Sequence, residues 1–200
     1  MIMEKIYVRD AVREDAPDVA RMILLAWPVE EFLKMNPGMT QDDFTCFIRK
    51  FVEADDNLYS HLYTSVAVLV SDDGTERIVG AMNGYDGALY RTLKQPVLDA
   101  MKESFGSGND FASVVETEAG EFYLDSVGVD PSMRSRGIGS MLFDAMIQRA
   151  VRSGFKVVGL IVDEDKPKAE ALYLRLGFRT VGFRDFLGHR MKHMQKELQA

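Results

Sequence analysis

The residues with the clearest chemical potential lie in one short turn, Arg134-Ser135-Arg136-Gly137-Ile138-Gly139-Ser140. A helical pattern follows this turn, and the first amides of a helix have no acceptor within the helix. The helix dipole adds roughly half a positive charge at that end. Gly137 and Gly139 carry no side chain that would block an approaching group, while Arg134 and Arg136 add full charges. The turn therefore predicts an anion-binding site for phosphate; the alternative is an ordinary glycine turn with solvated arginines.

Two elements would hold this turn in place. Phe122–Val129 is an apolar run with the length of a buried strand, and Asp130-Pro131 ends it because proline cannot extend a ladder. Residues 140–152 repeat apolar side chains at helical spacing, and Gly154 is typical of the position just after a helix. A strand, a basic glycine turn and a helix are thus expected in direct succession.

Two other phosphate-binding motifs fit the turn less well. A dinucleotide fingerprint needs a third glycine and an acidic residue about 20 positions later. Leu142 takes the place of the third glycine, and seven residues separate Val129 from Gly137, although Asp163 does end the next strand. A dinucleotide-binding oxidoreductase stays as a weaker alternative, and a P-loop is excluded because no Gly-Lys-Ser/Thr follows.

A third motif matches better. Arg134-x-x-Gly137-x-Gly139 resembles the acyl-CoA-binding motif of the GNAT superfamily of N-acetyltransferases, Gln/Arg-x-x-Gly-x-Gly/Ala, which cradles the CoA pyrophosphate. Downstream, Ala169-x-x-x-Tyr173-x-x-x-Gly177-Phe178 looks like the second signature of that family, Asn-x-x-Ala-x-x-x-Tyr-x-x-x-Gly-Phe. Lys166 stands at the asparagine position, which puts one hydrogen bond to the pantetheine arm in doubt. The resemblance covers residues 121–182.

The resemblance implies acetyl-CoA as cosubstrate and a primary amine, in a small molecule or a peptide, as acceptor. The amine would attack directly in a ternary complex. Whether the acyl group is acetyl or larger stays open, and so does a non-catalytic CoA-binding module, which Lys166 favours and Tyr173 opposes. The cofactor-binding positions that the resemblance implies are Val127, Gly128, Val129, Arg134, Ser135, Arg136, Gly137, Ile138, Gly139 and Ser140.

Two catalytic residues are expected. Tyr173 is the candidate general acid, because a phenol stays protonated at neutral pH and can give its proton to the departing thiolate. It could equally be the aromatic residue of a buried helix face. Strand alternation places Asp125 and Glu121 on one face with Val127, so Asp125, or else Glu121, could take a proton from the ammonium of the acceptor. Asp125 could also be a structural acid with a buried partner.

The expected fold is α/β, namely the GNAT fold: a mixed, mostly antiparallel sheet flanked by helices and splayed between its fourth and fifth strands. At 200 residues, a single domain over 1–200 is expected, with an acyl-CoA-binding core over 121–182. The elements expected outside the arginine–glycine turn agree with this fold. They are a strand at 6–9, a helix capped by Asp15, a helix capped by Thr40, a hairpin around Asp72-Asp73-Gly74 and, later, a helix capped by Asp165 and a closing strand pair around Leu187-Gly188.

The segment 86–120 is longer than a simple connection, which indicates an insert. A helix is expected to begin at Pro96, and a flexible loop covers residues 105–110. The insert would form a lid over the acceptor site or would be a passive decoration. Trp27, Glu30, Glu31 and Phe32 are candidate pocket residues; the alternative is two core aromatics and two solvated glutamates.

Composition narrows the class of protein. The net charge of −7 argues against a nonspecific nucleic-acid surface, and no apolar run has the roughly 18 residues of a membrane span. Cys46 is the one cysteine, so no intrachain disulfide can form and a cytoplasmic location is expected. Cys46 is predicted to be a packed thiol of the core. The scattered histidines predict no metal site, and the family resemblance allows a homodimer.

Overall fold

The computed structural model describes residues 5–105, 114–186 and 188–198. The internal contacts of the chain divide it into two compact units, which are described separately below. The first unit holds Met1–Gly84 and Ser126–Met146, and the second holds Tyr85–Asp125 and Ile147–Ala200. The single domain predicted over 1–200 stays a prediction.

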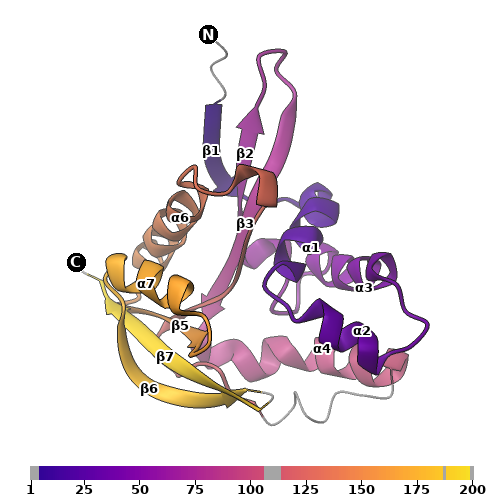
Figure 1. The fold of residues 1–200 in the computed structure, drawn as a ribbon. Coiled ribbons are helices and arrows are strands. Elements are labelled where there is room, and N and C mark those ends of the chain that lie inside the picture. Colours follow the sequence, from indigo (N-terminus) through magenta and orange to yellow (C-terminus); the bar gives the residue numbers. More distant parts are fainter. Residues whose placement is uncertain (1–4, 106–113, 187, 199–200) are drawn as a thin grey trace. The chain divides into compact units, whose positions relative to one another are not determined.

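The described residues form seven strands with helices before, between and after some of them (Figure 1). The strands are β1 Lys5–Asp10, β2 Thr64–Val70, β3 Glu76–Asp86, β4 Phe122–Val129, β5 Val157–Asp163, β6 Arg179–Phe186 and β7 His189–Glu197. The α-helices are α1 Ala16–Leu24, α2 Val29–Met35, α3 Gln41–Glu53, α4 Tyr90–Phe105, α6 Ile138–Arg152 and α7 Pro167–Arg175. Short 3-10 turns are η1 Arg13–Asp15, η2 His61–Tyr63, η3 Gly87–Leu89 and η4 Pro131–Met133.

The sheet order is β1-β2-β3-β4-β5-β7-β6. The pairs β1–β2, β2–β3, β5–β7 and β6–β7 are antiparallel, and β4–β5 is parallel. The parallel register joins Phe122 to Val158 and Tyr123 to Gly159, at the start of both strands. The predicted fold class, a mixed and mostly antiparallel sheet flanked by helices, is confirmed.

In the first unit, β2 carries the core of the sheet, and its first six residues are all buried. Helices α1 and α3 pack against each other and bury apolar faces that include Ile23 and Ile48 (Figure 1). Phe44 links this helical layer to its surroundings, since its ring stacks on Phe32 at a centroid distance of 4.2 Å and meets Trp27 edge-on at 5.6 Å. The layer supports β4 from the side of α1.

In the second unit, β7 lies between β5 and β6, so three strands of the C-terminal half form one antiparallel ladder. Helix α7 ends in a Schellman-type turn, in which Gly177 has φ +93° and the Phe178 amide donates to the Tyr173 carbonyl at 3.0 Å. Lys192 on β7 donates to Glu170 on α7 at 2.8 Å. These bonds fix α7, and with it Tyr173, relative to β7.

Several expected helix starts can now be compared with the structure. Thr40 caps α3 as predicted, with a reciprocal bond pair to Asp43. Asp15 stands at the N-cap position of α1 but does not cap it, because its carboxylate binds Arg9 at 2.6 Å and the Val12 amide at 2.8 Å. The prediction of Asp165 as a cap was also wrong, since Lys166 is the N-cap residue of α7.

The helix of the insert begins earlier than predicted. α4 starts at Tyr90, and Pro96 lies inside it. The proline removes one backbone donor, but Leu93, Val97 and Met101 are buried at helical spacing and hold the helix together across it. The predicted lid loop, with Gly106 to Asn109, lies outside the described residues. Helix α2 was not predicted.

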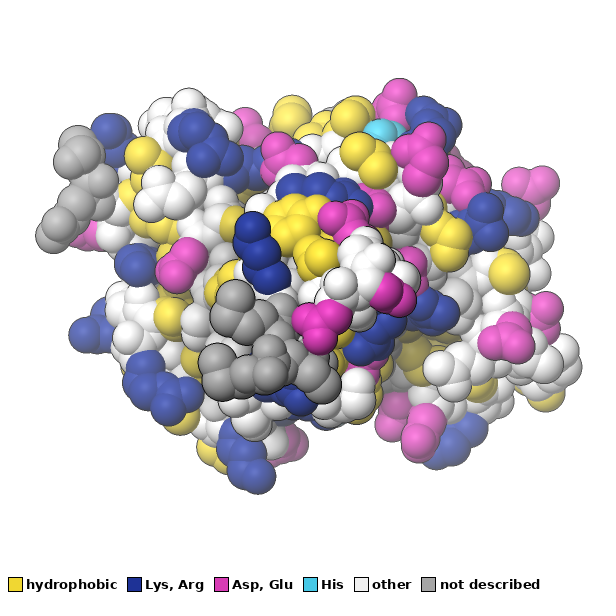
Figure 2. Space-filling view, turned by 90° about the horizontal axis from the view of Figure 1, so that it is seen from above, with side chains coloured by type: hydrophobic (Ala, Val, Ile, Leu, Met, Phe, Trp, Pro, Cys, Tyr) yellow, Lys and Arg dark blue, Asp and Glu magenta, His cyan; other side chains and the backbone are white. Residues whose placement is uncertain are grey.

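The surface mixes both signs of charge. On the face drawn in Figure 2, dark blue lysine and arginine side chains are interspersed with magenta aspartate and glutamate side chains. Within the described ranges, no helix combines the length and the apolar composition that crossing a bilayer requires.

Candidate functional site

The arginine–glycine turn, residues 134–140, lies in the first unit between η4 and α6. Asp130 fixes the approach to it: its carboxylate accepts from the Ser132 amide at 2.9 Å and from Arg77 on β3 at 2.7 Å. The Asp130 amide donates to the Val79 carbonyl at 2.9 Å. The chain therefore leaves β4 in a defined direction, because three bonds fix the residue that ends the strand.

The backbone then turns sharply into α6. Ser135 and Gly137 both have positive φ, at 63° and 80°. The Gly137 carbonyl accepts the Met141 amide at 3.1 Å, which makes Gly137 the start of the α6 ladder. The amides of Ile138, Gly139 and Ser140 lie in the first helical turn, where no carbonyl of the same helix can accept them. Arg134, Ser135, Arg136 and Gly137 are exposed, so a ligand can reach this helix start.

Gly139 is the residue of the turn whose type the rest of the chain does not explain. Its φ is not among the positive values, and a Cβ built on it would meet no atom within 4 Å. Neither backbone conformation nor internal packing therefore requires a glycine there, although a glycine inside a helix costs about 1 kcal/mol relative to alanine. A ligand that approaches the backbone would require it. The turn thus fits a phosphate group on its own geometry.

Ile138 contributes differently from its neighbours. Its side chain is 1% exposed, so only its backbone amide can face a ligand. A Cβ on Gly80 of β3 would lie 3.1 Å from side-chain atoms of Ile138 and Leu142. Close packing of α6 on β3 at Gly80 therefore sets the position of the turn.

The predicted cofactor strand also lies in the first unit. Val127 and Val129 are half-buried on β4, while Gly128 between them is buried. A Cβ on Gly128 would lie 1.9 Å from the Met22 carbonyl oxygen of α1, so internal packing alone requires this glycine. Asn83 on β3 accepts the Ser126 amide at 3.0 Å and fixes the start of this segment.

The two predicted catalytic residues lie in the second unit. Tyr173 on α7 is half-buried, and its ring meets Phe178 edge-on at 6.2 Å. Burial raises the pKa of the Tyr173 phenol above its usual value of 10.0, so the group carries its proton at neutral pH. Asp125 on β4 is half-buried, and its carboxylate accepts from Tyr85 at 2.6 Å. Tyr173 is thus a proton donor at neutral pH, and the Asp125 carboxylate has a hydroxyl donor.

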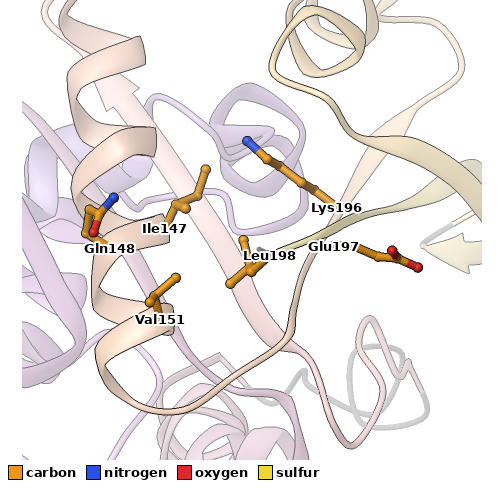
Figure 3. Close-up of a pocket in the computed structure, with 6 residues that line it drawn as sticks. All are labelled: Ile147, Gln148, Val151, Lys196, Glu197 and Leu198. Atoms are coloured by element: carbon orange, nitrogen blue, oxygen red, sulfur yellow. The ribbon is translucent and has the colours of Figure 1, made fainter. Parts of the chain in front are cut away.

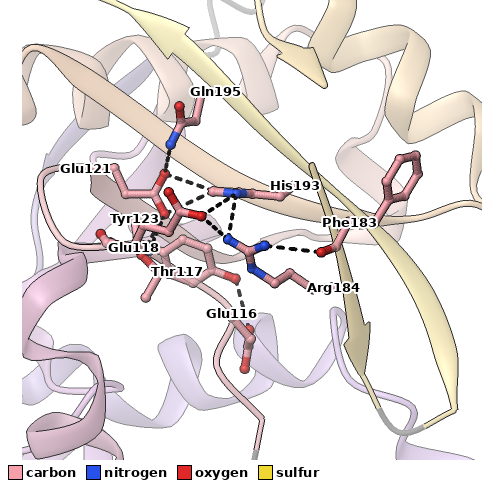
Figure 4. Close-up of polar contacts among 9 residues, drawn as sticks. All are labelled: Glu116, Thr117, Glu118, Glu121, Tyr123, Phe183, Arg184, His193 and Gln195. Carbon is pink, nitrogen blue, oxygen red and sulfur yellow. Dashed lines mark hydrogen bonds and ion pairs between the residues drawn. The ribbon is translucent and has the colours of Figure 1, made fainter. Parts of the chain in front are cut away.

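Glu121, the other candidate base, lies in a buried cluster (Figure 4). Its carboxylate is 1% exposed and accepts from Thr117, the Glu118 amide, His193 and Gln195. Burial opposes ionisation, but these hydrogen bonds outweigh it and hold the pKa of Glu121 below its usual value. We call Glu121 and these partners, with Arg184, the Glu121 cluster. Its bonds make Glu121 a structural carboxylate.

The depressed pKa of Glu121 has a direct consequence for stability. A carboxylate that is easier to ionise in the folded state than in the unfolded chain contributes stability above its unfolded pKa. That contribution is lost as the pH falls through the folded pKa. The cluster thus stabilises the second unit at neutral pH and weakens in acid.

A pocket of about 400 Å³ lies elsewhere in the second unit, between the last turns of α6 and the end of β7 (Figure 3). Its wall combines apolar side chains with the stems of two charged residues, and the close-up shows the Lys196 and Glu197 head groups pointing away from each other. The α6 residues here follow the arginine–glycine turn by two helical turns or more. The lining residues are Ile147, Gln148, Val151, Lys196, Glu197 and Leu198.

Three side chains at the end of β5 come close enough to share a cation. The ligand atoms of Asp163, Asp165 and His189 lie within 4.8 Å of one another. Asp163 accepts from the Asp165 amide at 2.9 Å and lies 2.9 Å from His189, so the carboxylate already has partners. The expectation that no metal is needed stays a prediction.

The structure also shows how deeply Cys46 and the four candidate pocket residues are buried. Cys46 is exposed, so the prediction of a packed core thiol was wrong; it lies on the outer side of α3. Phe32 is 2% exposed and belongs to the core, whereas Glu30 and Glu31 are exposed, as the alternative interpretation expected. Trp27 is half-buried against Phe44.

Sequence reasoning missed Tyr85 and Glu116. Tyr85 ends β3 and is 1% exposed, yet its hydroxyl group reaches Asp125. Glu116 lies near the end of the insert and accepts from Tyr90 at 2.5 Å and from Tyr123 at 2.9 Å. The available signal was a tyrosine in each of the apolar strands β3 and β4, but alternation alone cannot pair Tyr85 with a partner 40 positions away.

Comparison with known proteins adds an independent view. The chain is 41% identical to the mycothiol acetyltransferase of Gordonia bronchialis over 63 residues, which are 32% of this chain and 20% of that protein. It is 42% identical to the N-alpha-acetyltransferase RimI of Mycobacterium tuberculosis over 64 residues, 32% of this chain and 39% of that protein. The matched segments therefore span well under two thirds of these relatives.

Solved structures agree over nearly the whole chain. A crystal structure described as an acetyltransferase superposes with a TM-score of 0.73 at 29% identity, covering 96% of this chain and all of the other. An N-acetyltransferase from Staphylococcus aureus Mu50 has the same fold, with a TM-score of 0.76 at 18% identity, and covers 94% of this chain and 99% of its own. The model of the family described as Acetyltransferase (GNAT) family matches residues 36–178. With its fold, its arginine–glycine turn and this match in agreement, the chain belongs to the GNAT family of acetyltransferases.

Proposed function

We propose that the chain transfers an acetyl group from acetyl-CoA to a primary amine by direct attack in a ternary complex. Gly139 is the observation that carries the proposal, because neither packing nor backbone conformation requires a glycine at this half-buried position in the first turn of α6. The turn amides and the charges of Arg134 and Arg136 would bind the pyrophosphate. Backbone groups of Val127, Gly128 and Val129 would pair with the pantetheine arm.

The chemical step needs a base and an acid. Asp125 would take a proton from the ammonium, directly or through water, so that the neutral nitrogen can attack the thioester carbonyl. As the new C–N bond forms, the C–S bond breaks, and the Tyr173 hydroxyl would give its proton to the departing sulfur. The nitrogen would lose its second proton to solvent, and Tyr173 would regain a proton from solvent, which leaves a neutral amide, the free thiol of CoA and the tyrosine hydroxyl group. The raised pKa of Tyr173 supports this role, because the phenol remains a proton donor throughout the neutral range.

The acceptor is a primary amine of a class that the family does not decide. The two curated relatives carry the names of a mycothiol acetyltransferase and an N-alpha-acetyltransferase, so both a small molecule and a peptide amine are candidates. Lys166, exposed at the N-cap of α7, stands where the family has asparagine. This substitution keeps a non-catalytic CoA-binding module as the second candidate.

Titration calorimetry with acetyl-CoA, with NAD and NADP as controls, tests the binding half of the proposal. Saturable binding of acetyl-CoA alone is expected. Binding of NAD without acetyl-CoA would instead favour a dinucleotide enzyme and direct attention to Asp163. Release of free thiol with putrescine, lysine or an alanine-initiated peptide would then exclude the non-catalytic module.

Tyr173→Phe tests the chemical half. The variant loses the proton donor but keeps the aromatic ring against Phe178, so kcat should fall by at least about 100-fold, the usual contribution of general acid catalysis. The dissociation constant for acetyl-CoA, measured in the same titration, should change less than about threefold. Turnover at the wild-type rate would remove Tyr173 as the acid.

A further inference from the structure

The carboxylate of Asp125 is held by a residue that the mechanism above does not use. Tyr85 lies at the end of β3 with 1% of its surface exposed, and its hydroxyl group donates to Asp125 Oδ2 at 2.6 Å. That distance is typical of a hydroxyl group bound to an ionised oxygen. Asp125 itself is half-buried, so the bond joins a buried donor to an acceptor that solvent can reach.

Tyr85 belongs to a larger polar group, which we call the Asp125 cluster: Tyr85, Tyr90, Lys94, Glu116, Tyr123 and Asp125. Tyr90 and Tyr123 donate to the two oxygens of Glu116 at 2.5 and 2.9 Å; Figure 4 shows the second bond. Lys94 is 8% exposed and donates to the Tyr90 hydroxyl group at 2.8 Å. Two carboxylates thus share three phenols and one buried amine.

The rings tie the two halves of this cluster together. The centroids of Tyr85 and Tyr123 lie 6.0 Å apart, and those of Tyr90 and Tyr123 lie 6.4 Å apart in an edge-on arrangement. Burial raises the pKa values of Tyr85 and Tyr123, and the charges of Asp125 and Glu116 add to this. Burial lowers the pKa of Lys94, while Glu116 and Asp125 oppose that change. Both carboxylates therefore act on the same buried groups.

We propose that Tyr85 is the positioning residue for Asp125, fixing its carboxylate in one orientation and stabilising its ionised form through a short hydrogen bond. The inference rests on the proposed function, in which Asp125 is the base. When Asp125 takes the proton from the ammonium, the Tyr85 hydroxyl group keeps its own proton and continues to donate to Oδ2. Glu116 acts in the opposite sense, because a second negative charge in the cluster disfavours ionisation of Asp125.

Tyr85→Phe tests this in the full-length protein. Two measurements are needed. The first is an NMR titration of the Asp125 carboxyl carbon in protein with ¹³C-labelled aspartate, in which the Asp125→Asn variant identifies the signal. The second is the pH profile of kcat/KM. The profile uses acetyl-CoA and the fastest of putrescine, lysine and an alanine-initiated peptide. Loss of a hydrogen bond to a charged group should move both the carboxyl midpoint and the acidic limb upward by about one pH unit.

Two further variants allow the inference to be tested even if Tyr85→Phe folds poorly. Glu116→Gln removes the second negative charge and should move the midpoint and the acidic limb to lower pH, opposite to Tyr85→Phe. Tyr7→Phe is the matched control, because Tyr7 also donates to a carboxylate, that of Glu76, at 2.9 Å but on the exposed surface of β1. It should leave both readouts unchanged.

The outcomes separate this inference from the proposed function. A carboxyl midpoint that stays within about 0.3 pH units in both Tyr85→Phe and Glu116→Gln overturns the positioning role, even if Asp125→Asn is inactive. A midpoint that moves while the acidic limb stays would support the stabilisation of Asp125 by Tyr85, but it would show that Asp125 is not the base and so overturn that part of the proposed function. Uniform loss of rate at every pH, with no shift, would mean that Tyr85 is merely structural.

Discussion

The arginine–glycine turn and the Glu121 cluster both gather charged groups, but the turn exposes them to solvent and the cluster buries them. In the turn, Arg134 and Arg136 are exposed, and Gly139 has open space where a Cβ would be. In the cluster, Glu121 and His193 are each 1% exposed and hydrogen-bond at 2.9 Å. The buried polar groups of the Glu121 cluster are hydrogen-bonded to one another inside the fold. A glycine that neither packing nor backbone conformation requires instead indicates a ligand.

Glycines sharpen the same contrast. At Gly128 an added Cβ would lie 1.9 Å from the Met22 carbonyl oxygen, and at Gly159 it would lie 1.9 Å from the Glu121 carboxylate. Both glycines are therefore explained by internal packing. Gly139 has no such neighbour, so internal packing does not explain it.

Breaking the Glu121 cluster should have the largest effect on stability. His193→Ala removes one hydrogen-bond donor of a buried carboxylate and leaves a cavity, so the free energy of unfolding should fall by about 3 kcal/mol or more. Urea unfolding followed by circular dichroism measures this. The control is His189→Ala, since His189 pairs with Asp163 on the surface and should change stability by less than about 1 kcal/mol. Equal losses in the two variants would contradict the contrast.

Breaking the turn should affect binding and leave stability alone. Arg134→Ala removes a charge-assisted contact worth about 1.5–3 kcal/mol, so the affinity for acetyl-CoA should fall by about 10- to 100-fold. Its unfolding midpoint in urea should match that of the wild type, because Arg134 is exposed. Arg13→Ala is the control, as Arg13 is an exposed partner of Asp55. The same loss of affinity in both variants would count against a specific site.

The smallest effect is expected at Gly139, where a substitution should raise stability and lower the affinity for acetyl-CoA. Gly139→Ala should raise the free energy of unfolding by up to about 1 kcal/mol, because alanine favours the helix. It should also weaken acetyl-CoA binding, because the methyl group occupies space that the ligand needs. Gly128→Ala is the comparison and should destabilise by about 1–3 kcal/mol through overpacking. A Gly139→Ala protein that binds acetyl-CoA normally would contradict the cradle.

Local signals predicted much of the fold correctly. Thr40 capped α3, Gly74 turned the β2–β3 hairpin and Gly177 ended α7 as expected, because each depends on neighbours a few residues away. Helix α1 begins at Ala16 as predicted, but the expected cap by Asp15 and the expected helix start at Pro96 failed where other contacts competed. Arg9 took the Asp15 carboxylate, and a buried face carried α4 through Pro96.

By itself, the sequence determined the family, the fold class and the position of the arginine–glycine turn, since a strand, a glycine turn and a helix start depend on backbone conformation and short-range spacing. Only the tertiary structure decided which carboxylate is structural. Glu121 and Asp125 lie four positions apart on the same face of the chain, yet His193 reaches one across 72 positions and Tyr85 the other across 40. A hydrogen-bond partner that far along the chain is set by the order of strands, which local periodicity does not record.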